Sequence, residues 1–179
     1  MMFKSSTQTK KLMNKENEKI TILGVDPGYQ RIGLAILEKT KNGDVLKFST
    51  CIETSADIDH DKRLLKLGIE TSDVIKKYKP QIFSIEGLFF NKNVKTALQV
   101  AEARGVLLFQ ASLASLEVEE YSPLQIKMSV TGNGRSGKQE IIKMVECLVN
   151  CPKNIKFDDE YDAIAIALTA SSHYRYNRI

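Results

Sequence analysis

Three runs rich in apolar and β-branched residues near the start of the chain predict strands. They span residues 20–25, 32–37 and 45–54. The dipeptide Asn42-Gly43 separates the second run from the third, and such a pair between two apolar runs is a strong hairpin signal. We therefore expect three antiparallel strands at the start of the fold.

Helical spacing of apolar residues begins near His60 and continues to Tyr78, where Pro80 stops it. Residues 81–86 then form another apolar run. A strand, a helix and a strand in this order imply a parallel crossover. The remaining pattern predicts a strand at residues 118–121 and helices at residues 94–116, 123–130, 139–149 and from 158 or 159 to 174.

Together these elements predict the α/β class, with a mixed five-stranded sheet of three antiparallel and then two parallel strands, flanked by helices. Residues 20–179 are expected to form this one domain, because 179 residues are an ordinary size for a single core. Residues 1–19 are polar without periodicity and are expected to be a disordered leader. The leader has no arginine and no clear amphipathic face, which argues against a targeting peptide.

Composition excludes some classes of protein. Hydrophobic residues make up 42% and charged residues 27%, as in soluble globular proteins, and no apolar run is long enough to span a membrane. The net charge of +4 is mildly basic and gains meaning only from where the charges lie. With three cysteines and two histidines, a Cys/His zinc site is not expected, and reduced thiols suit a cytoplasmic protein.

Acidic residues end two of the predicted strands. Asp26 ends the first strand and is followed by Pro27-Gly28, and Glu86 ends the strand at residues 81–86. An isolated Asp-Pro-Gly is most often only a turn. Ligands of such sheets gather at the carboxyl ends of strands, however, and Asp26 and Glu86 could face each other there.

The last helix adds further acids. Asp159 and Asp162 are three residues apart and share one helix face, whereas Asp158 and Glu160 are explained by the helix dipole, with Asp158 as the N-cap. Whether Asp158 or Asp159 faces the site stays open. Four convergent carboxylates repel one another unless a hard divalent cation such as Mg²⁺ binds them. Two such ions could support hydrolysis of a phosphodiester.

A Gly-rich segment from Gly132 to Lys138 fits the phosphate-binding pattern G-x-x-x-x-G-K of nucleotide hydrolases. The pattern requires Ser or Thr next, where this chain has Gln139, and the preceding segment is predicted as a helix where the pattern needs a strand. We therefore reject nucleotide binding here. A flexible loop that carries Arg135 and Lys138 suits a polyanion better.

Several of these segments together resemble the RuvC family of Holliday-junction resolvases, from about Ile20 to the C-terminus. The matching motifs are Gly24-Val-Asp26-Pro-Gly28, Ile85-Glu86-Gly-Leu-Phe89, Ala103-Arg104-Gly105, Glu120-Tyr121-Ser-Pro-Leu-Gln-Ile-Lys127 and Asp159-Glu-Tyr-Asp162-Ala-Ile-Ala. The resemblance implies a ribonuclease H-like fold and a homodimer that cuts two strands of a four-way DNA junction, with Mg²⁺ or Mn²⁺. It also implies a branch-migration motor complex as a partner.

Carried over residue by residue, the resemblance assigns metal ligation and catalysis to Asp26, Glu86, Asp159 and Asp162. It assigns base contact near the crossover to Phe89, and contact with the scissile strand to Lys127 and Lys138. Arg135 joins the DNA-binding set through its loop.

Other interpretations stay open. Arg31-Ile-Gly33 also resembles the YqgF family of RNA-processing nucleases, which share the fold, and a non-catalytic junction-binding module would have the same architecture. An actin-like phosphotransferase needs two duplicated subdomains, which 179 residues cannot supply. The helix at residues 94–116 has a wide apolar surface, which makes it either a dimer surface or an ordinary core helix.

Overall fold

The computed structural model describes residues 19–87 and 94–174, so the predictions for Phe89 and for nearly all of the leader lie outside the described residues. Its sheet has the strand order β3-β2-β1-β4-β5. β1 pairs antiparallel with β2 and parallel with β4, which confirms the predicted mixed sheet. The strands are β1 (Ile20–Asp26), β2 (Arg31–Thr40), β3 (Gly43–Glu53), β4 (Ile82–Glu86) and β5 (Glu117–Tyr121).

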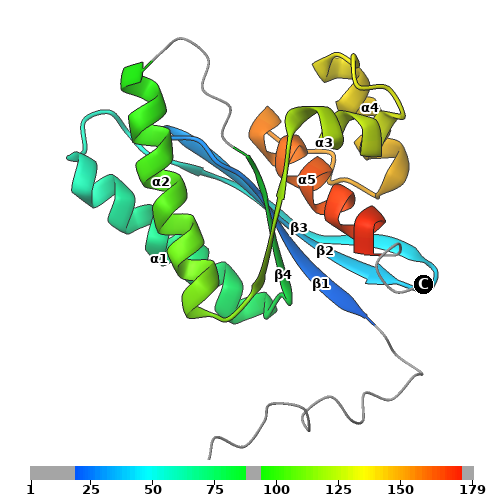
Figure 1. The fold of residues 1–179 in the computed structure, drawn as a ribbon, viewed down its shortest axis with the longest axis horizontal. Helices are drawn as coiled ribbons and strands as arrows, with labels where there is room; N and C mark the ends of the chain where they lie inside the picture. The colour runs from blue at the N-terminus through cyan, green and yellow to red at the C-terminus, as the bar shows by residue number, and fades with distance from the viewer. Residues whose placement is uncertain (1–18, 88–93, 175–179) are drawn as a thin grey trace, which may run out of the picture.

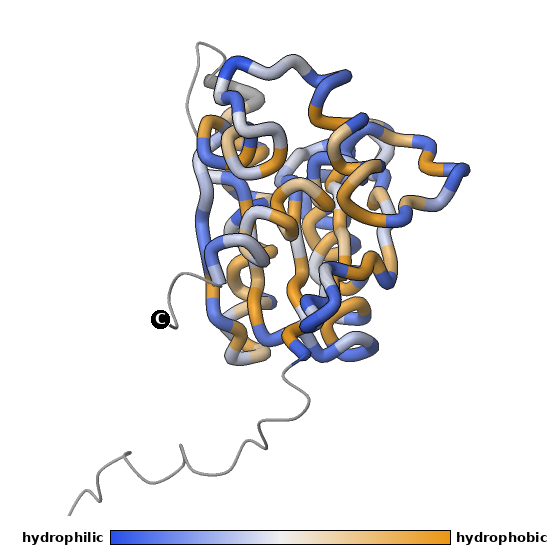
Figure 2. Tube along the Cα trace, turned by 90° about the vertical axis from the view of Figure 1, so that its right-hand side faces the viewer, coloured by the Kyte–Doolittle hydropathy of each residue, from blue (hydrophilic) through white to orange (hydrophobic). Residues whose placement is uncertain are grey.

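Helices cover both faces of the sheet (Figure 1). One face is covered by α1 (His60–Tyr78) and α2 (Val94–Leu113). The other is covered by α5 (Asp158–Tyr174), with α3 (Pro123–Thr131) and α4 (Lys138–Leu148) beside it. The tube of Figure 2 shows hydrophobic stretches running through the middle of the fold and hydrophilic ones at its loops. None of the helices within residues 19–87 and 94–174 is both long and apolar enough to cross a membrane.

The two-residue repeat of β1 divides its side chains between these two layers. Ile20 and Ile22 belong to the core beneath α5, whereas Leu23 and Val25 belong to the core beneath α1 and α2. Because both faces are buried, the strand is apolar at nearly every position, as the sequence pattern indicated.

Two glycines allow α5 to lie directly on the sheet. A Cβ atom on Gly24 would lie 2.2 Å from the carbonyl oxygen of Ala163, and one on Gly33 would lie 1.9 Å from that of Asp159. These separations are far shorter than van der Waals contact. Glycine at both strand positions therefore fixes how close the first turns of α5 come to β1 and β2.

Two sequence predictions at turns had different outcomes. The hairpin between β2 and β3 is confirmed, and Gly43 in it has a φ of 125°, which only glycine adopts readily. The helix predicted to reach residue 116 instead ends at Leu113. Ser115 follows in a left-handed conformation with a φ of 56°, because the chain must reverse within three residues to begin β5.

Candidate active site

Strand alternation and register bring Asp26 and Glu86 together. Val25 and Ile85 are paired in the parallel register of β1 and β4, so the next residues, Asp26 and Glu86, are neighbours at the same edge of the sheet. Both follow the alternation that points Gly24 and Ser84 toward α5; the hydroxyl of Ser84 donates a hydrogen bond to a carbonyl oxygen of that helix at 3.2 Å. Both carboxylates therefore face α5.

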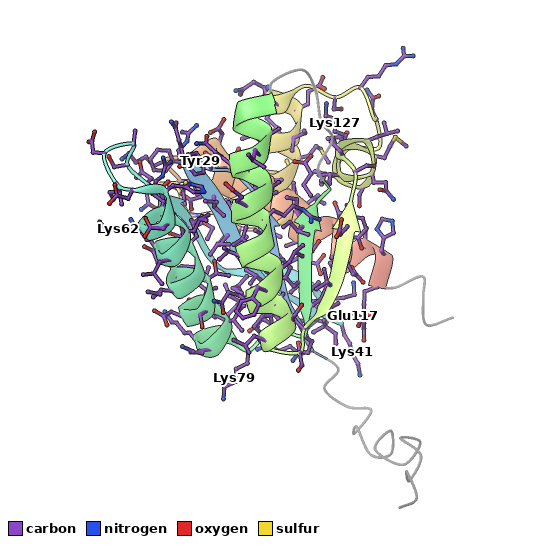
Figure 3. The ribbon with its side chains drawn as sticks, turned by 60° about the vertical axis from the view of Figure 1, so that its left-hand side comes forward. Tyr29, Lys41, Lys62, Lys79, Glu117 and Lys127 are labelled. Atoms are coloured by element: carbon purple, nitrogen blue, oxygen red, sulfur yellow. The ribbon has the colours of Figure 1, made fainter. Side chains whose placement is uncertain are left out.

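A pocket of about 140 Å³ lies where these strand ends meet α5. Three of the four predicted ligands line it: Asp26, Glu86 and Asp162. Lys127 of α3 lines it as well, and Figure 3 shows Lys127 at the end of the molecule opposite Lys41 and Lys79. The rest of the lining is formed by Pro123, Ile126, Ile141, Ala165 and Ile166.

The electrostatics of the pocket reflect crowded negative charge. Burial raises the pKa of Asp26 to about 8, and the charges of Asp162, Glu86 and Asp159 add to this rise. Burial also raises the pKa of Glu86 and of Asp162; Lys127 opposes the rise at Glu86 and Lys138 opposes it at Asp162. Two nearby lysines thus offset only part of the repulsion among the carboxylates.

Asp159 approaches the same cluster from the first turn of α5 but does not line the pocket. Its Oδ2 atom lies 3.3 Å from Nε of Arg31, at the start of β2, and its charge is one of those that raise the pKa of Asp26. The structure therefore brings all four predicted acids into one neighbourhood, with Asp159 at its edge.

Asp158 is the first residue of α5, and its carboxylate forms ion pairs with two basic side chains. Oδ2 of Asp158 pairs with Nζ of Lys138, and Oδ1 lies 3.9 Å from Nη2 of Arg31. The hydrogen bond from Lys138 lowers the pKa of Asp158. Because α5 begins at Asp158, this residue lies in the first turn and not at the predicted N-cap position, and its carboxylate forms two ion pairs that the N-cap interpretation did not predict.

Arg135 lies in the Gly-rich loop that follows α3, and Lys138 lies at the end of this loop. A helix therefore precedes the Gly-rich segment, as predicted, which supports the rejection of a nucleotide-binding loop. Lys138 begins α4 and its Nζ also lies 3.1 Å from Oδ2 of Asp162. Arg135 is exposed, and its backbone N–H donates to the side chain of Asn133 at 3.0 Å. The structure thus places Lys127 and Lys138 at the pocket and leaves Arg135 on the loop.

The turn after Asp26 is held by contacts from α1 and from the residue that follows β3. The hydroxyl of Thr54 donates to the carbonyl oxygen of Tyr29 at 2.8 Å, and the buried guanidinium of Arg63 donates to the same oxygen at 3.2 Å. The hydroxyl of Tyr29 is 2.9 Å from Nδ1 of His60, whose Nε2 is 2.7 Å from a carboxylate oxygen of Glu102. These bonds fix the loop that follows the first strand-end acid.

The donor set suits a hard divalent cation, because it consists of carboxylate oxygens whose charge is only partly balanced. Among the described residues, no three acidic, histidine or cysteine side chains are close enough together to hold an ion in the conformations seen. Lys138 occupies Oδ2 of Asp162. An ion bound to Asp162 would therefore lie close to this ammonium group and be repelled by it.

Sequence reasoning missed Arg31, although a signal for it exists. Gly33 pairs with Asp26 across the hairpin, and Arg31 lies two residues before Gly33 on the same strand. The alternation therefore puts Arg31 on the face that α5 covers, beside the acids of the first helical turn.

Glu160 has a structural role: it is buried and accepts a hydrogen bond from Ser49 at 2.7 Å.

Comparisons with known proteins agree with this architecture. The family model for crossover junction endodeoxyribonuclease RuvC matches residues 22–170. The crossover junction endodeoxyribonuclease RuvC of Halothermothrix orenii is 42% identical over 159 residues, covering 89% of this chain and 96% of that protein. The protein of the same name from Brachyspira hyodysenteriae is 42% identical over 153 residues, covering 86% and 94%.

Solved structures give the same result at the level of fold. The structure of Thermus thermophilus RuvC matches with a TM-score of 0.81 and 25% identity, covering 88% of this chain and 97% of that one. The T. thermophilus RuvC in complex with Holliday junction substrate matches with a TM-score of 0.83 and 26% identity, covering 88% and 96%. These matches confirm the ribonuclease H-like fold and favour the RuvC resemblance over the YqgF alternative.

Proposed function

Because the chain belongs to the RuvC family of crossover junction endodeoxyribonucleases, we propose that it resolves four-way DNA junctions by hydrolysing phosphodiester bonds in recombination and repair. The observation that carries this proposal is the pocket lined by Asp26, Glu86 and Asp162 together with Lys127. Acids at two strand ends and on a facing helix would supply oxygen ligands for a divalent cation, and a lysine beside them suits a phosphate.

Asp26, Glu86, Asp159 and Asp162 are the residues that would hold Mg²⁺, with Mn²⁺ as the alternative and two ions in each site. When bound, such ions supply activation of a water nucleophile and stabilisation of the leaving oxygen. The chain itself contributes the orientation of the ligands. β1 and β4 fix Asp26 and Glu86 by their register, and the close approach of α5 fixes Asp159 and Asp162.

Lys127, Arg135 and Lys138 are proposed to bind DNA phosphates, and Phe89 is proposed to stack on bases near the crossover. Support for the lysines comes from their places beside the carboxylates, where a scissile phosphate would have to lie. Their positive charge would offset the repulsion between that phosphate and the acids.

We also propose a homodimer, because two symmetric cuts need two sites. Support comes from α2 and α1, which expose several large apolar side chains on their outer side. These are Leu98, Phe109 and Leu113 of α2, with Leu65 and Ile69 of α1. A branch-migration motor complex as partner and a cytoplasmic location are proposed from family membership alone.

The decisive experiment compares a synthetic four-way junction, a linear duplex of the same sequence and a structured RNA, each with Mg²⁺ and with EDTA. We expect symmetric nicks in the junction only, and only with Mg²⁺. Cleavage confined to RNA would indicate a YqgF-like activity. Tight junction binding without cleavage under any metal condition would indicate a non-catalytic module.

A further inference from the structure

One ion-pair network at the pocket is not explained by the four proposed ligands. It consists of Arg31, Asp158 and Lys138, and Asp158 joins the two cations through its two carboxylate oxygens. Each of these two basic side chains also contacts one of the acids of the site: Arg31 lies 3.3 Å from Asp159, and Lys138 lies 3.1 Å from Asp162. The network therefore lies along the edge of the carboxylate cluster.

This network differs from an ordinary surface salt bridge. Pairs between exposed side chains usually contribute little to stability, and the three residues are 42–48% exposed. What sets the network apart is the second partner of Lys138. An ammonium group 3.1 Å from Oδ2 of Asp162 offsets part of the charge of this carboxylate and repels a divalent cation that approaches it, so the two cations compete electrostatically for Asp162.

Lys138 is also placed so that it can leave. It is the first residue of α4 and follows the exposed Gly137 at the end of the Gly-rich loop. Ile141, one turn further along α4, lines the pocket. The ammonium group ends a flexible four-carbon chain that is 48% exposed, and it lies 3.1 Å from a carboxylate oxygen of Asp162, which lines the pocket.

We propose that Asp158 is a positioning residue that keeps Lys138 on Asp162 while the site lacks a divalent cation, and that cation binding frees Lys138 to contact a DNA phosphate. The inference rests on the proposed nuclease function. In it, Lys138 serves as an internal counter-ion in one state and as a phosphate contact in the other. Lys138 thus couples metal binding to DNA binding.

The first test measures how junction affinity depends on salt, in EDTA and in Ca²⁺, under conditions where a gel shows no cleavage. A lysine that contacts a phosphate adds roughly one unit to the slope of log affinity against log salt. We expect Lys138→Gln to lower the slope by about one unit in Ca²⁺ and to leave it unchanged in EDTA. Equal effects in both conditions, or no effect in either, would overturn the proposal.

Asp158→Asn tests the positioning role itself. Without the Asp158 charge, Lys138 is held less firmly, so the slope in EDTA should become steeper than wild type by up to about one unit. The double variant Asp158→Asn/Lys138→Gln should lose this gain. An unchanged slope for Asp158→Asn in EDTA contradicts the assignment. Lys47→Gln is the matched control, since Lys47 is similarly exposed and lies 3.7 Å from Glu38 near the other end of the sheet.

A second measurement needs no DNA, so it separates failure of this inference from failure of the proposed function. NMR of ¹⁵N-labelled lysine should show a hydrogen-bonded ammonium signal for Lys138 in EDTA, absent from Asp158→Asn. Mg²⁺ at concentrations that calorimetry shows to be saturating should remove it from the wild type. A signal that persists with Mg²⁺ bound would overturn the inference while leaving the nuclease proposal intact.

Discussion

At the scale of single residues, Asp26 is where the requirements of folding and of the proposed chemistry conflict most. Its carboxylate ends a buried strand and faces three other acids. A buried charge without a partner destabilises a fold, and a carboxyl group in this situation takes up a proton instead. The raised pKa means that the residue needs either a proton or a cation near neutral pH.

This conflict predicts how stability depends on pH in EDTA. The pKa of Asp26 is about 8 in the folded chain, above its ordinary value of 3.8. The folded state therefore retains a proton that the unfolded state releases, and stability is lost as pH rises from about 4 to about 8. We expect Asp26→Asn to flatten this fall and to be more stable than wild type at pH 8 by a few kcal/mol, on the order expected for such a shift. Denaturant unfolding from pH 5 to 9 measures this; parallel curves for both proteins would contradict it.

The acids should also separate binding from cleavage. Asp26→Asn and Asp162→Asn each keep the side-chain shape. Near neutral pH in EDTA the carboxyl group of Asp26 already holds a proton, so its amide changes little, whereas Asp162→Asn removes a charge that repels phosphate; both variants should therefore bind a junction in EDTA at least as well as wild type. Loss of a charged ligand should lower cleavage in Mg²⁺ by at least about a hundredfold, since weaker changes around metal sites already reduce affinity or activity by roughly 10–100-fold. Gel assays of binding and nicking measure both.

Asp73→Asn is the control for these two variants, because Asp73 lies on the exposed surface of α1 and pairs with Lys76. Its cleavage should match wild type. Near-normal cleavage by Asp26→Asn would contradict the assignment of the pocket.

At the scale of elements, the position of α5 decides whether the acids meet. The helix lies on β1 and β2 only because Gly24 and Gly33 present no side chain to it. Its first two turns carry Asp159 and Asp162, so any displacement of this end of the helix moves both acids relative to the strand ends. Glycine at these positions is thus part of the geometry of the site.

Gly33→Ala should therefore impair both folding and activity. The new methyl group would lie 1.9 Å from the carbonyl oxygen of Asp159, and overpacking of this kind typically destabilises by about 1–3 kcal/mol. Cleavage per folded molecule should fall as well, because α5 must shift. Gly105→Ala is the control: nothing lies within 4 Å of its added Cβ, and alanine favours a helix interior. Thermal unfolding and cleavage rates check the two variants; equal rates would contradict a positional role for Gly33.

Much of this arrangement could be predicted at the level of elements. The apolar runs predicted the strands, Asn42-Gly43 predicted the hairpin, and the acids at the ends of two predicted strands pointed to Asp26 and Glu86. The ion pairs of Arg31, Asp158 and Lys138 could not be predicted, because long charged side chains meet according to the local packing of segments that are far apart in sequence. The predicted end of α2 was wrong because the turn after it is formed by Ser115 in a left-handed conformation, and a serine is not as clear a turn signal in the sequence as glycine or proline.

At the scale of the whole molecule, the proposed active site and the proposed dimer surface lie on different sides of the sheet. The pocket lies at the ends of β1 and β4 on the α5 side, whereas the exposed apolar side chains that we propose for the dimer lie on α1 and α2. Figure 1 shows that α5 and the pair α1 and α2 cover opposite faces of the sheet. Separate surfaces allow two chains to associate while both pockets stay open to DNA.

Variants of α2 test this association. Phe109 and Leu113 are 62% and 70% exposed, so replacing both with serine should leave the fold of one chain nearly unchanged. We expect light scattering to show a dimer for wild type and a monomer for Phe109→Ser/Leu113→Ser. Leu148→Ser on α4 is the control and should stay dimeric, since Leu148 is 47% exposed on the opposite layer. A wild type that is monomeric at micromolar concentration, alone and with junction DNA, would rule out the proposed dimer.

The pocket draws its acids from both the first strand and the last helix, and this has a consequence for synthesis on the ribosome. Asp26 emerges early, but α5 supplies Asp159 and Asp162 only when nearly the whole chain has been made. A chain broken off before residue 158 would contain the central strand and lack half of the acids. On the proposed assignment of the acids, incomplete products of translation therefore cannot cut DNA, and the nuclease activity begins only once α5 has been made.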